Sequence, residues 1–272
     1  MPTEEKRREI SVLIEHLKKH KDAVLIIGDK FTKDLNLKNI HELEEGVFDR
    51  KSWVKTPLVF WENYINNIFL DNNKIKELPS IYKSINRLIN LGIIKKVISV
   101  NTHGLIEAAI NIKGIANGFK CSRCGEFYTK EDLENIKEPS KDLIESINTI
   151  NCKKCNLKKI RPSCLMSGEN YLHNELNVML SEVFNDNKES EDKKDKETPN
   201  THSIIYIGVD MDEDLMSELF DNYVLVRNRI EDECYNILIT DSSATVATFK
   251  PEFATSENIE DSLNRLIDLL EK

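Results

Sequence analysis

Apolar residues along the chain follow two patterns. Short, unbroken apolar runs that end in glycine or a polar residue are typical of strands buried on both faces of a sheet. Such runs lie within residues 23–28, 95–101, 202–208, 222–228 and 235–241, and residues 160–168 have a strand-like composition. Segments with apolar residues three and four positions apart are typical of amphipathic helices. We expect helices at residues 4–20, 53–70, 79–91, 103–111, 170–184, 212–221 and 256–271.

The alternation of these elements favours one fold class. Short apolar strands separated by helices predict an α/β protein with a doubly wound, mostly parallel sheet covered on both faces. Residues 119–164 break the pattern, because two pairs of cysteines enclose a polar stretch there. We therefore divide the chain into a large domain, residues 1–118 and 165–272, and an inserted small module at 119–164. Within the large domain, residues 185–200 have no apolar residue apart from Pro199 and predict a flexible loop.

The inserted module holds four cysteines in two C-x-x-C pairs. They are Cys121, Cys124, Cys152 and Cys155. Four thiolates in two chelating turns suit a tetrahedral Zn²⁺ ion, with Zn–S bonds of about 2.3 Å. Four protein ligands leave no open position for water, so the predicted zinc site is structural rather than catalytic. A redox dithiol, or spacing by chance, is the alternative interpretation. The other two cysteines, Cys164 and Cys234, lie among apolar residues and are expected to be small buried hydrophobes.

The negative net charge argues against polyanionic partners. The chain has 38 Lys and Arg against 47 Asp and Glu, a net charge of -9, which opposes general binding to nucleic acid or anionic lipid. Basic residues around the second C-x-x-C pair leave a nucleic-acid-binding zinc ribbon as a third hypothesis, but aromatic residues are not interleaved with them. The first residues are charged, and no stretch reaches the roughly 20 apolar residues that cross a bilayer. We expect a cytoplasmic protein with no membrane or nucleic-acid partner.

Four segments resemble the motifs of one protein family. IRPSCLMSGE (160–169) looks like L-R-P-D-x-V-x-F-G-E, and SVNTHGL (99–105) looks like T-Q-N-I-D-G-L. KTPLVFWENY (55–64) is similar to a D-P-x-x-F-W helix, and GVFDRKSW (46–53) is similar to G-I-P-D-F-R. Together with the cysteine module, they make the chain resemble the sirtuins, the NAD-dependent protein deacylases, from about residue 20 to the C-terminus.

The resemblance implies an architecture and a set of site residues. The architecture is a Rossmann-like domain with a zinc-bearing small domain, with NAD across the strand ends and an acyl-lysine tunnel between the domains. The cofactor-binding residues that it implies are Gly28, Lys30, Thr32, Arg50, Asn101 and Gly208. Asn101 and His103 are the candidates for catalysis. Asp49 and Arg50 can hold a phosphate or a carboxylate, although a surface ion pair explains them equally well.

The sequence departs from the family where the pyrophosphate would bind. The family has G-A-G-I-S after the first strand, and its glycines let the backbone approach the pyrophosphate. Here residues 28–32 read Gly-Asp-Lys-Phe-Thr, which places side chains in that approach. Lys30 can pair with a phosphate, but Asp29 repels one. We therefore expect weakened dinucleotide binding.

Further departures concern the catalytic residues. The family's general base is the His of an H-G pair before the first zinc cysteine, and that pair is Lys113-Gly114 here. A lysine ammonium keeps its proton at neutral pH and cannot readily accept one from a ribose hydroxyl. Val100 and His103 replace a Gln and an Asp of the family, and residues 208–210 read Gly-Val-Asp in place of G-T-S.

These departures favour a pseudoenzyme. This hypothesis describes a sirtuin-like binding or scaffold protein with a structural zinc site, an eroded NAD site and a protein partner. The alternative is a working NAD-dependent protein-lysine deacylase, or another NAD-consuming enzyme such as a hydrolase or ADP-ribosyl transferase, with His103 as its base. His103 can also be a partly exposed loop histidine. The oligomeric state stays open, and no role is assigned to the other histidines, which are His16, His20, His41, His173 and His202.

Overall fold

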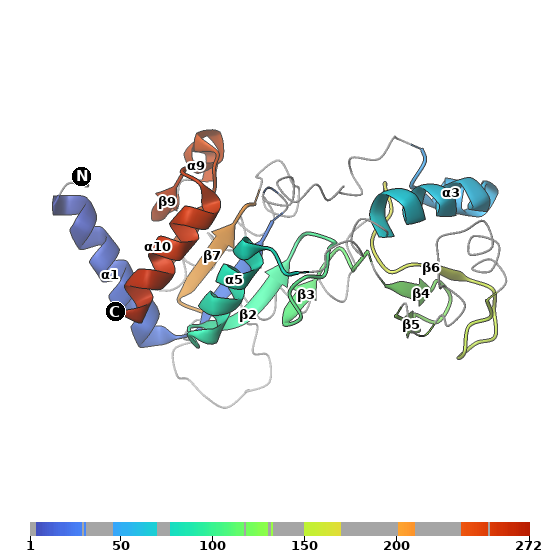
Figure 1. Ribbon diagram of the computed structural model, residues 1–272, viewed down its shortest axis with the longest axis horizontal. Helices are drawn as coiled ribbons and strands as arrows, with labels where there is room; N and C mark the ends of the chain where they lie inside the picture. The colour runs from blue at the N-terminus through green and yellow to red at the C-terminus, as the bar shows by residue number, and fades with distance from the viewer. Residues whose placement is uncertain are drawn as a thin grey trace, which may run out of the picture.

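The protein has two lobes, one built on a six-stranded sheet and the other on a three-stranded sheet (Figure 1). The computed structural model describes residues 4–28, 30, 46–69, 77–116, 118–129, 132, 150–169, 201–209, 235–249 and 251–272. Several predicted features lie outside these ranges. They are the helices at 170–184 and 212–221, the loop at 185–200, the strand at 222–228, and Cys234.

The six-stranded sheet is parallel throughout. Its strands are β1 (Ala23–Ile27), β2 (Ile94–Ser99), β3 (Ala109–Asn111), β7 (Ser203–Ile207), β8 (Tyr235–Ile239) and β9 (Phe253–Thr255). They lie in the order β3-β2-β1-β7-β8-β9, which is the Rossmann-like 3-2-1-4-5-6 order when these strands alone are counted along the chain. Every residue of β1 and β7 is buried, so both faces of the sheet are covered there. The predicted fold class is confirmed.

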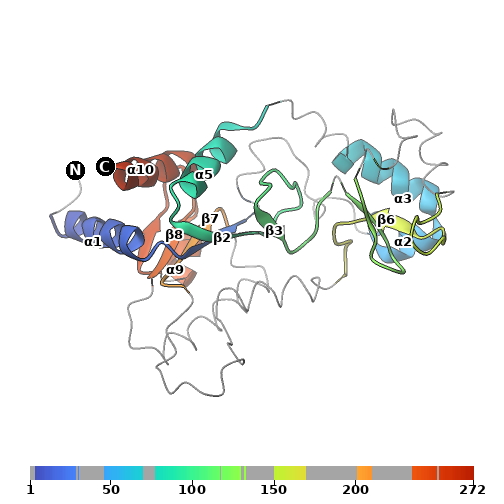
Figure 2. The ribbon, with the colours of Figure 1, turned by 90° about the horizontal axis from the view of Figure 1, so that it is seen from below.

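Three helices cover one face of this sheet. They are α1 (Glu4–His20), α5 (Ser80–Asn90) and α10 (Ile259–Glu271). Their apolar stripes, with Leu17, Ile85 and Leu263 among them, form one core cluster with the inward side chains of the strands. The helices α5 and α10 lie side by side (Figure 2), and Ser84 donates a hydrogen bond to Asn264 across their contact.

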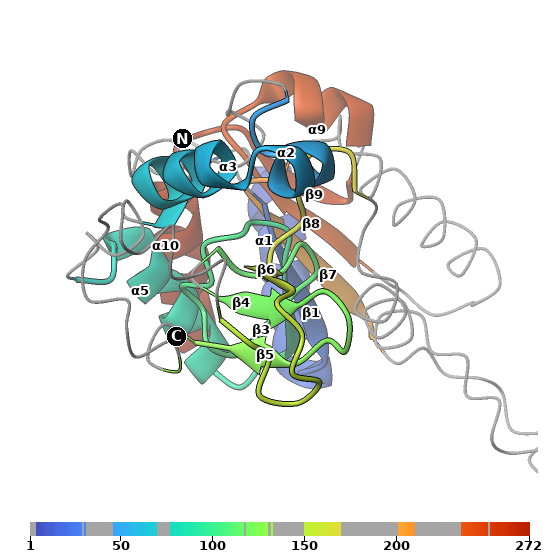
Figure 3. The same cartoon turned by 90° about the vertical axis from the view of Figure 1, so that its right-hand side faces the viewer.

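The second lobe packs helices on a small antiparallel sheet. The sheet holds β4 (Phe119–Cys121), β5 (Phe127–Tyr128) and β6 (Ile160–Pro162) in the order β5-β4-β6. Figure 3 shows α2 (Arg50–Lys55) and α3 (Pro57–Tyr64) lying over it, and the π-helical segment η3 (Ile65–Phe69) continues α3. Asp49 begins α2 with a reciprocal cap, in which its carboxylate accepts from the Ser52 N–H and Ser52 Oγ accepts from the Asp49 N–H.

The buried apolar side chains of residues 48–68 belong to the core of the second lobe. Phe48 stacks on Phe60 with ring centroids 5.0 Å apart, and both join a cluster with Phe119, Tyr128 and the cysteine module. The boundaries at 118/119 and 164/165 stay a prediction. The packing also shows that the segment 48–68, which comes earlier in the chain, completes the core around the cysteines.

Residues 103–111 form no helix, which corrects the prediction for that segment. Gly104 takes a left-handed backbone conformation (φ 65°), a turn follows, and Ala109–Asn111 form strand β3 beside β2. Only three residues of this nine-residue window, Leu105, Ile106 and Ile110, are large and apolar, which is too few to separate a helix from a turn and a short strand. The sequence analysis also missed the helix α9 (Ser243–Phe249) and strand β9. Among the described residues, no helix is both long and apolar enough to span a bilayer.

Candidate metal centre and strand-end site

Two similar turns present the four cysteines. In the first, the Gly125 N–H donates to the Cys121 carbonyl at 2.9 Å, and in the second the Asn156 N–H donates to the Cys152 carbonyl at 2.8 Å. Gly125 (φ 74°) and Asn156 (φ 58°) both take the left-handed conformation. Glycine and asparagine tolerate that conformation best, so the residue after each C-x-x-C pair makes the turn possible.

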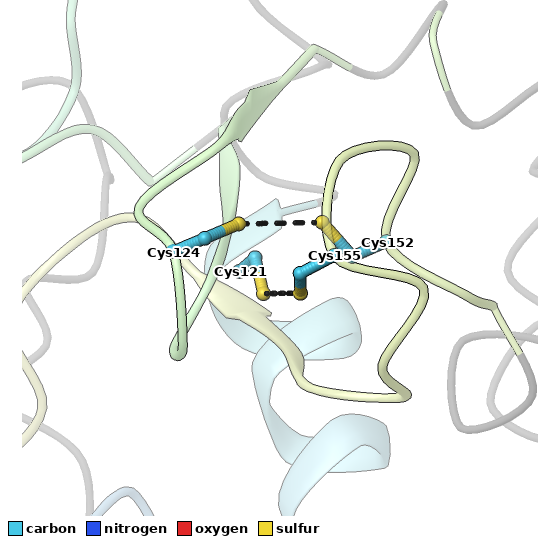
Figure 4. Close-up of side chains that lie close together, drawn as sticks. All are labelled: Cys121, Cys124, Cys152 and Cys155. Carbon is cyan, nitrogen blue, oxygen red and sulfur yellow. Dashed lines mark hydrogen bonds between the residues drawn. The ribbon is translucent and has the colours of Figure 1, made fainter.

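The four sulfur atoms converge on one point (Figure 4). Cys121 Sγ lies 3.6 Å from Cys155 Sγ, and Cys124 Sγ lies 3.5 Å from Cys152 Sγ. Each of these two contacts joins a cysteine of the first turn to a cysteine of the second. A tetrahedron with Zn–S bonds of about 2.3 Å has S···S edges of about 3.8 Å. The residues therefore fit a four-coordinate Zn²⁺ ion, and the grouping predicted from the sequence is confirmed as a cluster.

Tyr128 supports the cluster from the side. Its hydroxyl donates to Cys152 Sγ at 3.1 Å and accepts from the Lys153 N–H at 2.8 Å. Burial opposes the thiolate of Cys152, but the Tyr128 hydroxyl and the backbone N–H groups of Cys155 and Lys154 outweigh it and lower the Cys152 pKa to about 6. Because the thiolate is the form that binds metal, these donors prepare the ligand.

Cys164 has none of these features. Its side chain is fully buried, and burial raises the pKa of its thiol to about 12. It lies in the core beside the cluster but outside the group of four. The prediction that Cys164 is a small buried hydrophobe is confirmed.

The ends of β1 and β7 meet at two glycines. The Gly28 N–H donates to the Ile207 carbonyl and the Lys30 N–H donates to the Gly208 carbonyl, each at 2.9 Å. A Cβ on Gly28 would collide with the backbone of Gly208 and Val209. Gly28 is therefore needed for the approach of the two strand ends, whether or not a ligand binds there.

Lys30 and Asn101 are tied to the protein at this edge. Lys30 Nζ donates to Thr245 Oγ1 at 3.2 Å, and Asn101 Nδ2 donates to the Gly28 carbonyl at 3.5 Å. The His103 N–H in turn donates to Asn101 Oδ1 at 3.2 Å. We call Gly28, Lys30, Asn101, His103 and Gly208 the strand-end site, since they follow the carboxyl ends of β1, β2 and β7.

His103 is buried, with 2% of its surface exposed, so it is not the partly exposed loop residue that was one interpretation of the sequence. Burial lowers the pKa of its imidazole to about 4. The ring is neutral at pH 7. A base whose pKa is this far below the operating pH is poorly matched to proton abstraction.

The Lys113-Gly114 pair is locked against the chain that follows β6. Gly114 takes a left-handed conformation (φ 71°), and a Cβ on it would collide with the backbone of Ser163 and Cys164. The Leu165 N–H donates to the Lys113 carbonyl at 2.8 Å. Only glycine suits this position, so the register of the pair is set, and Lys113 is 4% exposed.

The remaining predicted cofactor residues lie elsewhere. Arg50 is exposed at the start of α2, in the second lobe. The carboxylate of its neighbour Asp49 caps that helix, and the Ser52 N–H bond lowers the Asp49 pKa. Thr32 lies outside the described residues, as do Asp29 and Asp210.

An ion pair between buried Arg161 and half-buried Glu169 closes the segment 160–169. The Arg161 guanidinium donates to both carboxylate oxygens of Glu169, at 2.5 and 2.6 Å, and to the Cys164 carbonyl at 3.1 Å. Burial raises the pKa of Glu169, but the bonds from Arg161 and from the Met166 N–H outweigh it, and the pKa is lowered overall. The two residues therefore hold the chain that leaves β6.

No family model and no curated protein sequence matches the chain, but solved structures do. A Sir2 homologue in complex with NAD matches with a TM-score of 0.68 and 16% identity, over 96% of this chain and 93% of that one. Sir2 bound to an acetylated peptide matches with a TM-score of 0.67 and 17% identity, over 95% and 97%. A sirtuin structure from work on the structural basis of sirtuin substrate affinity matches with a TM-score of 0.69 and 16% identity, over 98% of this chain and 99% of that one. The chain has the sirtuin fold.

The sirtuin fold extends over nearly the whole chain, and the chemistry has to be argued from its residues. Sequence reasoning grouped the four cysteines, but it missed Tyr128 and the pairing of Arg161 with Glu169. The cofactor roles of Gly28 and Asn101 stay a prediction. A tyrosine four residues after Cys124 was a signal for a partner of the cluster. The ion pair had its signal in an Arg and a Glu at the two ends of one motif.

Proposed function

We propose that this sirtuin-fold protein is a non-catalytic binding protein, in which the four cysteines hold a structural Zn²⁺ ion and the strand-end site no longer supports NAD chemistry. The feature that supports this most is Lys113, which stands in the sequence, by its spacing before Cys121, where the family has its catalytic histidine. The fixed register of Gly114 argues against a shifted loop that would bring another residue into that place. A lysine side chain offers no imidazole nitrogen to take a proton from a ribose hydroxyl.

The residues after β1 do not fit a dinucleotide well. In Rossmann-like sheets the pyrophosphate meets glycine backbone beyond the first strand. Here Gly28 packs directly on the Gly208 backbone, where a side chain would collide. The side-chain nitrogen of Lys30 is hydrogen-bonded to Thr245. Asp29, which separates Gly28 from Lys30 in the sequence, adds a carboxylate that repels a phosphate. We therefore derive no reaction step through NAD.

The cysteines, by contrast, suit zinc. Cys121, Cys124, Cys152 and Cys155 would hold it, and the ion would cross-link two turns that share the core of α3 and η3. Such a site stabilises the fold because ions bind the folded form only. With four protein ligands it has no position for a reacting water.

A protein partner is the occupant that we expect for the surface near the strand-end site. A sirtuin structure of similar shape holds an acetylated peptide, which is a fact about that protein. The net charge of -9 favours partners other than nucleic acid. A fold that is kept while its chemistry is lost is useful as a binding scaffold.

The test combines calorimetry with a product assay. NAD is titrated into the zinc-loaded full chain at two temperatures, and the same mixture is assayed for free nicotinamide with and without an acetyl-lysine peptide. We expect no nicotinamide above the buffer control, and weak or absent binding heat. Nicotinamide release that depends on the protein would overturn the proposal.

One observation keeps the enzyme alternative in the test. His103 is neutral at pH 7 and lies at the strand-end site, so its protonation state is that of a base. If nicotinamide is released, His103→Asn decides whether this residue is responsible, and Lys113→Gln serves as its matched control. Loss of turnover in His103→Asn alone would assign the base to His103.

The structural role of zinc is tested separately. Cys124→Ser removes one ligand, and Cys164→Ala removes a buried cysteine outside the cluster. We expect Cys124→Ser to lose zinc and melting temperature, and Cys164→Ala to retain its zinc. An unchanged melting temperature after chelation, with the metal shown to be gone, would contradict the structural role.

A further inference from the structure

A second group of metal-ligating side chains lies at the opposite end of the same two strands. His20 ends α1, Asp22 precedes β1, and His202 precedes β7. Lys21 between the first two takes a left-handed conformation (φ 54°), which turns the chain sharply from the helix into the strand. The group therefore lies at the amino ends of β1 and β7, whereas the strand-end site lies at their carboxyl ends.

The side chains of this group converge. One ligand atom from each of His20, Asp22 and His202 lies within 4.8 Å of the other two. The imidazole rings of His20 and His202 are stacked, with centroids 3.8 Å apart and planes 28° from parallel. Because the nitrogen lone pairs lie in the ring planes, one ring has to turn out of this stack before both can bind the same ion. His202 Nδ1 lies 2.6 Å from Asp22 Oδ2. Three groups that can donate electron pairs thus share one small volume.

The protein holds these side chains from several directions. The His202 N–H donates to Asp22 Oδ1 at 3.1 Å, and Thr201 Oγ1 donates to the Asp22 carbonyl at 2.7 Å. His16, one turn before His20 on α1, contacts the His202 carbonyl through Nε2 at 3.1 Å and packs edge-on against Tyr235. Asp22 and His202 are thus already held and lose little freedom when an ion binds, whereas His20 reaches the ion by a side-chain rotation.

The donor set selects a class of ion. Imidazole nitrogen with carboxylate oxygen suits Zn²⁺ and its neighbours among the transition metals, while Mg²⁺ and Ca²⁺ prefer oxygen ligands alone. In a tetrahedral site with bonds of about 2.0–2.1 Å, neighbouring ligand atoms lie about 3.3 Å apart. The 2.6 Å contact between His202 and Asp22 would need to lengthen by less than an ångström. All three residues are half-buried, which leaves room for water to complete the coordination.

We propose that His20, Asp22 and His202 form a second metal site, which takes a divalent transition-metal ion such as Zn²⁺. The positive charge of Lys19 acts on His20 and opposes a bound cation, and the carboxylate of Asp22 offsets it. This site uses three protein ligands, so an exchangeable water can take the fourth position, unlike at an ion held by four thiolates. The site is independent of the proposed function, because it shares no residue with the strand-end site or the cysteine cluster.

The test counts zinc ions on the untagged full chain. The protein is equilibrated against buffered free Zn²⁺, and bound zinc is measured by mass spectrometry of the metal. We expect two ions per chain for the wild type and one for His202→Asn and Asp22→Asn, with the weaker site losing about 100-fold or more in affinity. His103→Asn, the same change at a distant histidine, should keep both ions. A wild type that saturates at one ion, or variants that keep the second, would overturn the site.

A second measurement needs no variant. Diethyl pyrocarbonate modifies imidazole nitrogens, and the modified residues are located by peptide mass spectrometry. The cysteine cluster of the wild type is first filled with Zn²⁺. Further Zn²⁺ should then protect His20 and His202 from modification, and excess Mg²⁺ should not protect them. Equal labelling of both histidines with and without zinc would contradict the proposal even if the variants failed to fold.

Discussion

The backbone of Gly28 lies directly against the backbone of Gly208, where β1 and β7 end. This contact leaves no space for a side chain, and the strands are joined there by hydrogen bonds on both sides of it. Gly28, which a sequence comparison would assign to phosphate binding, is therefore required at this position by the packing of the two strands.

Gly28→Ala should lower the free energy of unfolding by about 3 kcal/mol, because backbone atoms must move to admit the methyl group. Gly168→Ala is the matched control. Gly168 also resists substitution (φ 75°), but no atom lies within 4 Å of its added Cβ, so its cost is about 1 kcal/mol of backbone strain. Chemical denaturation of the zinc-loaded proteins measures both, and equal losses would argue against the steric account.

Tyr128→Phe should weaken zinc binding at the cysteine cluster by about 10-fold or more, because the hydroxyl that stabilises the Cys152 thiolate is gone. Competition with a chromophoric chelator measures the change. Tyr64→Phe removes a hydroxyl from the same core that donates to the Ala116 carbonyl instead, and it should leave zinc affinity unchanged. Similar affinities for wild type and Tyr128→Phe would show that the hydroxyl does not tune the site.

Glu169→Gln should cost about 3 kcal/mol of stability, since it leaves the buried Arg161 charge without its partner. The matched control is Glu257→Gln, which breaks the exposed pair with Arg265 and should change stability by about 0.5 kcal/mol or less. Thermal unfolding of the two variants gives the comparison. The idea fails if both variants melt together with the wild type.

His103 should make stability depend on pH between about 4 and 6.5. Its pKa is lowered to about 4 by burial, so in that window the unfolded chain takes up a proton that the folded chain does not. Stability is therefore lost as the pH falls, by about 1.4 kcal/mol per unit and about 3 kcal/mol in all. Zinc release contributes at the same pH, so the measurement is the difference between wild type and His103→Asn. Parallel pH profiles for the two chains would exclude the effect.

The sequence predicted the central strands and the cysteine cluster because both depend on local patterns. A buried parallel strand is an apolar run, and a C-x-x-C pair forms its own turn. The segment 103–111 failed because its pattern was too short to separate a strand from a helix. The grouping of His20 and Asp22 with His202 had no local signal at all, since only the pairing of β1 with β7 brings those residues together.

The strand order also dictates when the protein can fold during synthesis. Of the strands that the structure describes, β1 comes first in the sequence, yet it lies in the middle of the sheet, and one of its two neighbours is β7. Residues that meet across this pair, such as Asp22 and His202, are 180 positions apart in the chain. Until β7 has been made, one edge of β1 has exposed N–H and C=O groups that other chains can pair with. We therefore expect the nascent protein to depend on chaperones for most of its translation, and the core of the large lobe to close only near the end.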